Sequence, residues 1–179
     1  MQDPAYSYCC CGLHRLKDVP MVEQQLIRII CTSVHHNNTG RVADTLAEAL
    51  HASVHSPDEA RTLDVSESDL LGFGSGIYFG RHHQALLQLV DSWPTRPCRV
   101  FIFSTAGLPF LRWFQHYALR RRLVRRGFEV VAEFCCRGWD TVGPLWFIGG
   151  INGRHPNAKD FASARAFALK IKDSIQKAH

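Results

Sequence analysis

The sequence predicts an α/β fold in which helices cover both faces of an open parallel sheet. Short runs rich in β-branched and aromatic residues alternate with longer segments whose apolar residues recur at helical spacing. The alternation shows no clear internal repeat. Strands that alternate with helices are typical of parallel sheets, because a crossover helix must return the chain to the start of the next strand.

Composition indicates one soluble, intracellular domain. The 179 residues are 46% hydrophobic and 21% charged, as in an ordinary globular protein. A domain of this size buries roughly 70% of its unfolded surface and needs neither disulfides nor a structural metal. No apolar run approaches the roughly 20 residues that span a bilayer, and no secretory signal is visible. We therefore expect a cytoplasmic protein with no integral membrane segment, whose seven cysteines are free thiols.

The N-terminal segment differs from the rest of the chain. Residues 1–22 show no apolar periodicity and contain the consecutive cysteines Cys9, Cys10 and Cys11. Unpatterned chain termini are commonly disordered. We therefore expect a disordered or dispensable tail over 1–22 and a single domain over 23–179.

The first half of the domain is expected to begin with a buried strand. Residues 26–31 are mostly apolar with β-branched members, as a strand buried on both faces requires. Apolar spacing predicts a helix over 39–51, with Thr39 as its N-cap. A short strand at or near a sheet edge is expected over 52–55.

The second half repeats the alternation. Strands are expected over 69–74, 99–103 and 128–134, the first of them ending in a glycine-rich turn. Helices are expected over 81–92, over 111–126 and from Asn157 onward. Pro94 stops the first of these helices, Gly127 is suited to the C-cap of the second, and Asn157 with Asp160 resembles a capping box at the start of the third.

Small polar residues follow three of the predicted strands. Segments 32–40, 74–80 and 104–108 are each rich in Gly, Ser, Thr or Asn. In an open parallel sheet, ligands bind beyond the carboxyl ends of the strands. We therefore expect these segments to form one pocket, although each by itself could be an ordinary turn.

The residue types of the three segments suit a phosphate and a flat ring. The first segment enters a helix, whose N-terminal N–H groups and dipole attract an anion. In the second, the glycines allow close backbone approach, while Tyr78 and Phe79 offer faces for stacking. The third could donate N–H groups to a ring edge. Neither the GxxxxGK[ST] phosphate loop nor a complete GxGxxG dinucleotide motif is present.

The segments Ser33–Thr39, Leu71–Gly80, Phe103–Gly107 and Gly149–Asn157 resemble the flavodoxin family, specifically its single-domain flavodoxin-like branch. The resemblance covers roughly residues 25–175. It implies a flavodoxin-like three-layer sandwich whose five-stranded parallel sheet has the order 2-1-3-4-5, the order known for flavodoxins, with noncovalently bound FMN. This chain has Asn37 where the family usually has glycine, and it is basic, with a net charge of +5, where flavodoxins are usually acidic.

The resemblance also implies a set of FMN-binding residues. Of these, Ser33, Asn38 and Thr39 would hold the phosphate, Tyr78 with its neighbours would contact the isoalloxazine, and Thr105–Gly107 would line its other edge. The full set is Ser33, Val34, His35, Asn37, Asn38, Thr39, Gly76, Ile77, Tyr78, Phe79, Ser104, Thr105, Ala106 and Gly107.

The expected function is electron transfer through bound FMN, to a redox partner protein or a small quinone-like substrate, with no acid or base residue required. One alternative is an FMN-dependent oxidoreductase acting on a quinone or a protoporphyrinogen-like substrate, which the long connection over 135–155 would suit. Another is a flavin-free binding module on the same fold. We expect neither a metal site nor nucleic-acid binding, since the histidine pairs lack ligand spacing and the basic segment lacks interleaved aromatics.

An arginine cluster and a tryptophan suggest two further hypotheses about binding. The arginine cluster Arg120–Arg126 is either a solvated helix face or a docking patch for an acidic redox partner or an anionic surface. Trp139, in the long connection, is expected to approach the flavin or its substrate, or else to pack on the sheet edge.

Overall fold

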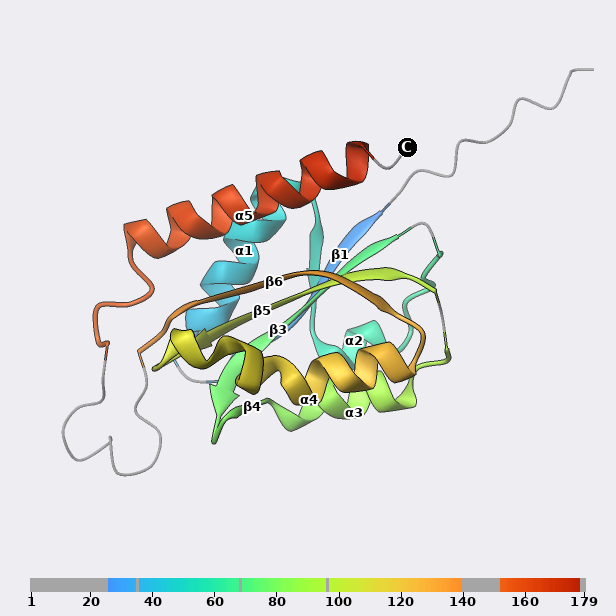
Figure 1. Cartoon of the computed structure of the whole chain (residues 1–179), viewed down its shortest axis with the longest axis horizontal. Coiled ribbons are helices and arrows are strands. Elements are labelled where there is room, and N and C mark those ends of the chain that lie inside the picture. The colour runs from blue at the N-terminus through green and yellow to red at the C-terminus, as the bar shows by residue number, and fades with distance from the viewer. Residues whose placement is uncertain (1–25, 35, 68, 96, 140–151, 178–179) are drawn as a thin grey trace, which may run out of the picture.

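The strand-like runs pair into one sheet between two layers of helices. The computed structural model describes residues 26–34, 36–67, 69–95, 97–139 and 152–177. The parallel strands are β1 (Ile27–Thr32), β2 (Ser53–His55), β3 (Leu70–Tyr78), β5 (Arg99–Ala106) and β6 (Glu129–Arg137). They lie in the order β2-β1-β3-β5-β6, with the short β4 paired to β3 off this path (Figure 1). Counted without β4, this is the expected order 2-1-3-4-5, which is confirmed.

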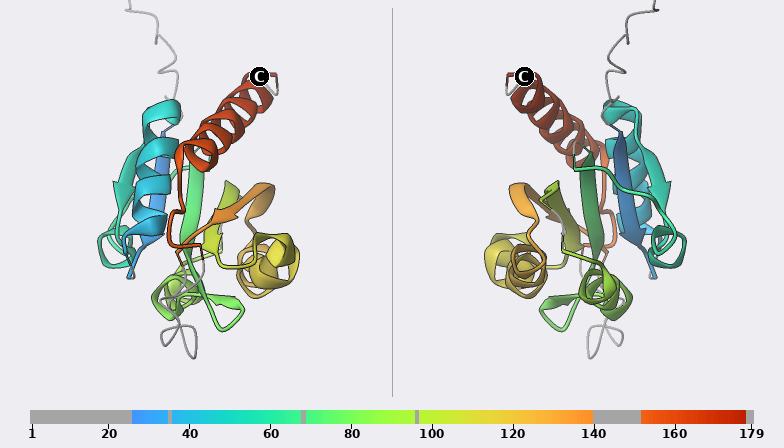
Figure 2. Two further views of the ribbon diagram at one scale, coloured as in Figure 1. Left: turned by 90° about the vertical axis from the view of Figure 1, so that its left-hand side faces the viewer. Right: turned by 90° about the vertical axis from the view of Figure 1, so that its right-hand side faces the viewer.

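Helices cover both faces of the sheet. On one face lie α1 (Asn38–Leu50) and α5 (Ala158–Gln176) (Figure 2). On the other lie α2 (Pro57–Ala60), α3 (Gln84–Ser92) and α4 (Arg112–Arg125), the last preceded by the 3-10 turn η1 (Pro109–Leu111). The expected capping box of α5 is confirmed, because the Asn157 side chain accepts N–H groups of the first turn while Asp160 accepts the Asn157 N–H.

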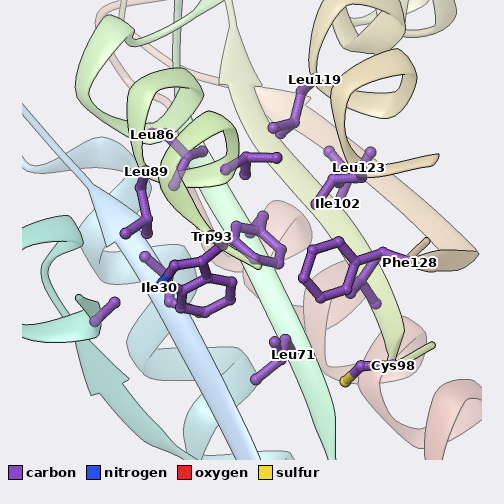
Figure 3. Close-up of a cluster of buried hydrophobic side chains, with 14 of the residues drawn as sticks. Ile30, Leu71, Leu86, Leu89, Trp93, Cys98, Ile102, Leu119, Leu123 and Phe128 are labelled. Atoms are coloured by element: carbon purple, nitrogen blue, oxygen red, sulfur yellow. The ribbon is translucent and has the colours of Figure 1, made fainter. Parts of the chain in front are cut away.

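Side chains along the strands alternate between two hydrophobic cores. Successive residues of a strand point to opposite faces, so Phe101 and Phe103 enter the core beneath α1 and α5, while Val100 and Ile102 enter the core beneath α3 and α4. Figure 3 shows this second core, where Ile102 lies among residues from α3, α4 and the neighbouring strands. Each fully buried side chain of this size contributes about 1.5–3 kcal/mol to folding.

Two glycines of β3 make room for the phenylalanines of β5. Phe101 and Phe103 are the register partners of Gly72 and Gly74. A Cβ atom added at either glycine would lie less than 3.0 Å from the facing ring. The expectation that the strand ends at Gly74 in a turn is wrong. β3 continues to Tyr78, and its glycines serve packing between strands.

A tight hairpin follows β3. Phe79 and Gly80 both have positive φ, at 49° and 76°, as a two-residue hairpin turn requires. β4 (Arg81–His82) then pairs antiparallel with the end of β3. The helix expected to begin at residue 81 therefore begins at Gln84, because Arg81 and His82 form β4 and His83 is the N-cap.

Other expected boundaries also shift. Asn37 is the N-cap of α1, where Thr39 was expected. Ser104–Ala106, expected as a loop, are the last residues of β5, because they pair with β6, which itself extends past Phe134 to Arg137. The short helix α2 was not predicted. It is built on a capping box of Ser56 and Glu59. The expected tail over 1–22 lies outside the described residues.

The close packing of glycine and phenylalanine can be tested with Gly74→Ala. We expect the free energy of unfolding to fall by about 1–3 kcal/mol, because the added methyl group must displace the Phe103 ring. Urea denaturation measures the effect. Gly153→Ala is the matched control, since its Cβ would have its nearest neighbour at 3.6 Å. The double variant Gly74→Ala with Phe103→Leu should lose less free energy of unfolding than the sum of the losses of the two single variants. Strictly additive losses would contradict the proposed contact between Gly74 and Phe103.

Candidate functional site

The turn between β1 and α1 has an unusual backbone. His36 and Asn37 are consecutive left-handed residues, with φ of 54° and 49°. Such conformations cost free energy in residues other than glycine, and they concentrate at functional sites. Asn37 caps α1 with no hydrogen bond from its side chain. Within the part of the chain that the structure describes, the start of α1 therefore has no side-chain cap from its N-cap residue, and its first N–H groups and partial positive charge are directed toward this turn.

Two hydroxyl groups in this turn are buried without partners. Thr32 Oγ1 and Ser33 Oγ are both inaccessible to solvent and make no hydrogen bond within the described residues. A buried hydroxyl left unpaired costs about 1–3 kcal/mol. Ser33 was expected to contact the phosphate. Thr32 was not, because sequence reasoning placed it in the turn and gave its hydroxyl no role, although it is the last residue of β1. Together with the uncapped helix, these groups suit a phosphate.

The turn is tied to the ends of β5 and β6. Thr39 Oγ1 and Thr105 Oγ1 lie 2.8 Å apart and share a buried hydrogen bond. The Asn38 side chain donates to the Trp139 carbonyl at 2.9 Å. His36 stacks on the Trp139 ring with 3.9 Å between centroids. The first and third predicted segments therefore meet, but the Asn38 and Thr39 side chains are held by protein partners.

One residue of the first predicted segment and two of the second line a groove of about 620 Å³, whose other lining residues lie between 81 and 91 and at Arg122. Val34 forms part of its wall, and Tyr78 and Phe79 at the hairpin form another part. The Tyr78 side chain lies above Gly76, where a Cβ would come within 2.8 Å of its hydroxyl. Pockets of roughly 300–1,000 Å³ hold ligands of cofactor size.

Some predicted residues lie elsewhere or are not described. Ser104 is fully buried, and its hydroxyl lies 2.8 Å from His116 Nε2, on the α3 and α4 side of the sheet. Ile77 pairs with His82 in the hairpin. Ala106 ends β5, and Gly107 accepts a hydrogen bond from the Asn152 side chain at 2.9 Å. His35 lies outside the described residues.

A buried polar cluster that sequence reasoning missed lies beneath the sheet ends. His82 and His116 are both buried, with ring centroids 5.0 Å apart. Ser75 Oγ contacts His82 Nδ1 at 2.9 Å, while His116 Nδ1 contacts Glu133 Oε2 at 3.3 Å. These residues come from β3, β4, α4 and β6, so no local sequence spacing connects them. Only the pairing of the strands brings them together.

Burial and hydrogen bonds shift the pKa values of His82 and Glu133 in this cluster. Burial lowers the pKa of His82 well below its usual 6.5, and the neighbouring His116 lowers it further. For Glu133, burial acts to raise the pKa, but hydrogen bonds from His116 and Arg120 outweigh it and the pKa is lowered. His82 is therefore neutral in the folded protein near neutral pH, and Glu133 is ionised.

Three of the described cysteines have thiols that burial keeps protonated. Cys31, Cys98, Cys135 and Cys136 are free thiols, as expected for these four. Burial raises the pKa of Cys31 to about 12 and that of Cys135 to about 11, and the pKa of Cys136 is raised as well. A thiol is nucleophilic only as the thiolate, so the candidate site uses none of these three as a nucleophile.

The architecture is that of flavodoxin-like proteins. Flavodoxin 2 from Bacillus cereus aligns with a TM-score of 0.60 at 16% identity, over 83% of this chain and 99% of that one. A WrbA-like flavodoxin from Agrobacterium tumefaciens aligns with a TM-score of 0.58 at 15% identity, over 86% and 99%. At such identities the likeness shows the fold.

The chain is also similar to part of a larger protein and, in sequence, to an archaeal protein. Rubredoxin oxygen:oxidoreductase from Desulfovibrio gigas aligns with a TM-score of 0.58 at 15% identity over 87% of this chain, which spans only 38% of that protein. No family model matches the sequence. The uncharacterized protein MJ0298 of Methanocaldococcus jannaschii is 43% identical over 143 residues, 80% of this chain and 95% of that protein. The chain belongs to the same family as MJ0298.

The buried histidine predicts a pH dependence of stability. Because the folded pKa of His82 lies below its unfolded value, the unfolded state binds more protons as pH falls below 6.5. Stability should therefore be highest above pH 6.5 and decline as pH falls through that value toward the folded pKa. Urea denaturation across this range measures the slope. His82→Asn should flatten it, while the exposed His51→Asn should not. An unchanged slope in His82→Asn would contradict the assignment.

Proposed function

We propose that this chain binds FMN noncovalently and passes electrons through it. The observation that carries the proposal concerns the start of α1 and the hydroxyls of Thr32 and Ser33 beside it. Among the described residues, both hydroxyls are buried without a hydrogen-bond partner, and the N-cap side chain makes no capping hydrogen bond. A phosphate needs several donors and a positive field, and this turn offers hydroxyl donors, helix N–H groups and the helix dipole. The flavodoxin-like fold supports the same reading.

Some residues of the turn would contact the phosphate of FMN, and others would hold the turn in place. Ser33 and Thr32 would donate to the phosphate, together with the backbone N–H groups of Asn38 and Thr39. The side chains of those last two residues already bind Trp139 and Thr105. They would act by fixing the turn against β5 and β6.

The isoalloxazine ring of FMN would lie near the hairpin formed by β3 and β4. The groove shared by Val34, Tyr78 and Phe79 is of suitable size, and its aromatic side chains can stack on a planar ring. Bound FMN supplies the electron-transfer chemistry, while the protein orients the ring and sets the polarity around it. Thr105–Gly107, at and just beyond the end of β5, remain the proposed neighbours of the other ring edge.

FMN binding is tested with the purified protein and a Ser33→Ala variant. A hydrogen bond to a charged group contributes about 1.5–3 kcal/mol, so we expect FMN binding to weaken by about tenfold to a hundredfold. Riboflavin, which lacks the phosphate, should bind both proteins equally. Titration followed by flavin fluorescence measures both affinities, and Ser163→Ala on the exposed start of α5 is the control.

Two outcomes would contradict parts of this proposal. A protein that neither carries a flavin absorbance spectrum nor takes up added FMN would favour the flavin-free binding module. Equal losses of FMN and riboflavin binding in Ser33→Ala would remove the hydroxyl from the phosphate site. Once FMN binding is established, steady-state turnover with NAD(P)H and a quinone separates an enzyme from an electron carrier.

A further inference from the structure

Aromatic side chains project into solvent around one end of α4. Phe79 lies at the tip of the β3–β4 hairpin, Phe110 in η1, and Trp113, Phe114 and Tyr117 in the first two turns of α4. Their exposed fractions lie between 58% and 88%. The hairpin tip and the helix are neighbours, since a Cβ on Gly80 would lie 3.5 Å from the Phe114 ring. A cluster of exposed apolar side chains of this kind marks an interaction surface.

Arginines continue the same face along the helix. Arg121 and Arg125 follow Tyr117 at intervals of four residues, so the three share one side of α4. The segment 107–128 contains six arginines and no Asp, Glu or Lys. Arg120 and Arg122 pair with Glu133 and Asp91. Within the described residues, neither Arg121 nor Arg125 has a carboxylate partner.

A groove of about 750 Å³ separates the hairpin from α4. Phe79 and Phe114 line it toward the hairpin tip, and Arg81, Arg121 and Arg125 contribute guanidinium groups to its walls. Guanidinium groups bind phosphate oxygens through paired N–H donors. The face therefore combines protruding apolar groups with a recess suited to phosphorylated headgroups.

We propose that this surface binds an anionic lipid membrane. The aromatic–arginine face is defined by the set Phe79, Arg81, Phe110, Trp113, Phe114, Tyr117, Arg121 and Arg125. Aromatic rings favour the boundary between headgroups and acyl chains, and arginines favour anionic headgroups. With this face on the membrane, α4 lies along its surface and α1 and α5 lie on the far side of the sheet (Figure 2).

Two features favour lipid over other anionic partners. Leu108 and Leu111 flank Phe110 in the sequence, Val124 lies in the last turn of α4, and all three are exposed, with exposed fractions between 39% and 56%. Aliphatic side chains insert among acyl chains but cannot stack on nucleic-acid bases. The aromatic side chains extend from the hairpin tip, η1 and α4, and each is between 58% and 88% exposed, as insertion into the interfacial region of a membrane requires. Among the described residues, no helix is long and apolar enough to cross a bilayer.

Vesicle co-sedimentation tests the proposal with the full chain, with and without added FMN, because membrane binding does not rest on the proposed flavin. Vesicles of phosphatidylcholine alone are compared with vesicles containing equal parts of phosphatidylcholine and phosphatidylglycerol. We expect at least about tenfold stronger partition onto the anionic vesicles. Failure of FMN binding with intact vesicle binding would affect only the proposed function.

Paired variants test the two components of the face. Arg121→Glu with Arg125→Glu should weaken binding by about 20-fold or more, and Trp113→Ser with Phe114→Ser by about tenfold. Lys159→Glu with Lys170→Glu makes the same charge change on α5, and Leu169→Ser removes an exposed apolar side chain there. These α5 controls should bind as the parent does. Circular dichroism melting verifies that each variant is folded.

Depth-dependent quenching gives an independent readout. Quenching of tryptophan fluorescence by brominated lipids should appear with the parent and disappear in Trp113→Phe, which should still bind. Quenching that persists in this variant would overturn the proposal, as would equal binding to neutral vesicles or equal loss in the α5 controls. Tighter binding to a single-stranded oligonucleotide than to anionic vesicles at the same salt would also overturn it.

Discussion

The fit of Phe101 and Phe103 of β5 against two glycines of β3 organises the sheet. Gly72 and Gly74 face these rings in register, and no larger residue fits there without moving them. The rings then fill the core beneath α1 and α5. Because this fit sets the register of the central strands, it also determines which residues reach the carboxyl edge, where the candidate site lies.

At that edge the alternation of side chains separates two sets of polar groups. Thr105 points toward α1 and binds Thr39, while Ser104, one residue earlier, points toward α4 and contacts His116. The first set organises the proposed phosphate turn. The second set closes the end of the other hydrophobic core with a buried polar cluster. Neighbours in sequence thus serve opposite layers, as strand geometry requires.

The two proposed surfaces share the β3–β4 hairpin. Phe79 lines the groove toward Val34 and also the groove toward Phe114 of α4. A protein docked through its aromatic–arginine face would therefore hold the proposed flavin groove beside the lipid surface. Membrane attachment and electron transfer would then be linked by geometry, because one hairpin takes part in both.

Sequence patterns predicted the five parallel strands, the helices α1, α3, α4 and α5, and the capping box of α5, while the strand order came from the resemblance. These follow from local patterns of apolar spacing and capping residues. Tertiary structure decided that the glycines of 72–76 continue a strand, that Ser104 turns away from the turn after β1, and that His82 meets His116. It also left the Ser33 hydroxyl buried, with no hydrogen-bond partner among the described residues. These outcomes depend on contacts between residues that are distant in sequence. Strand pairing and packing create such contacts, and local sequence patterns do not predict them.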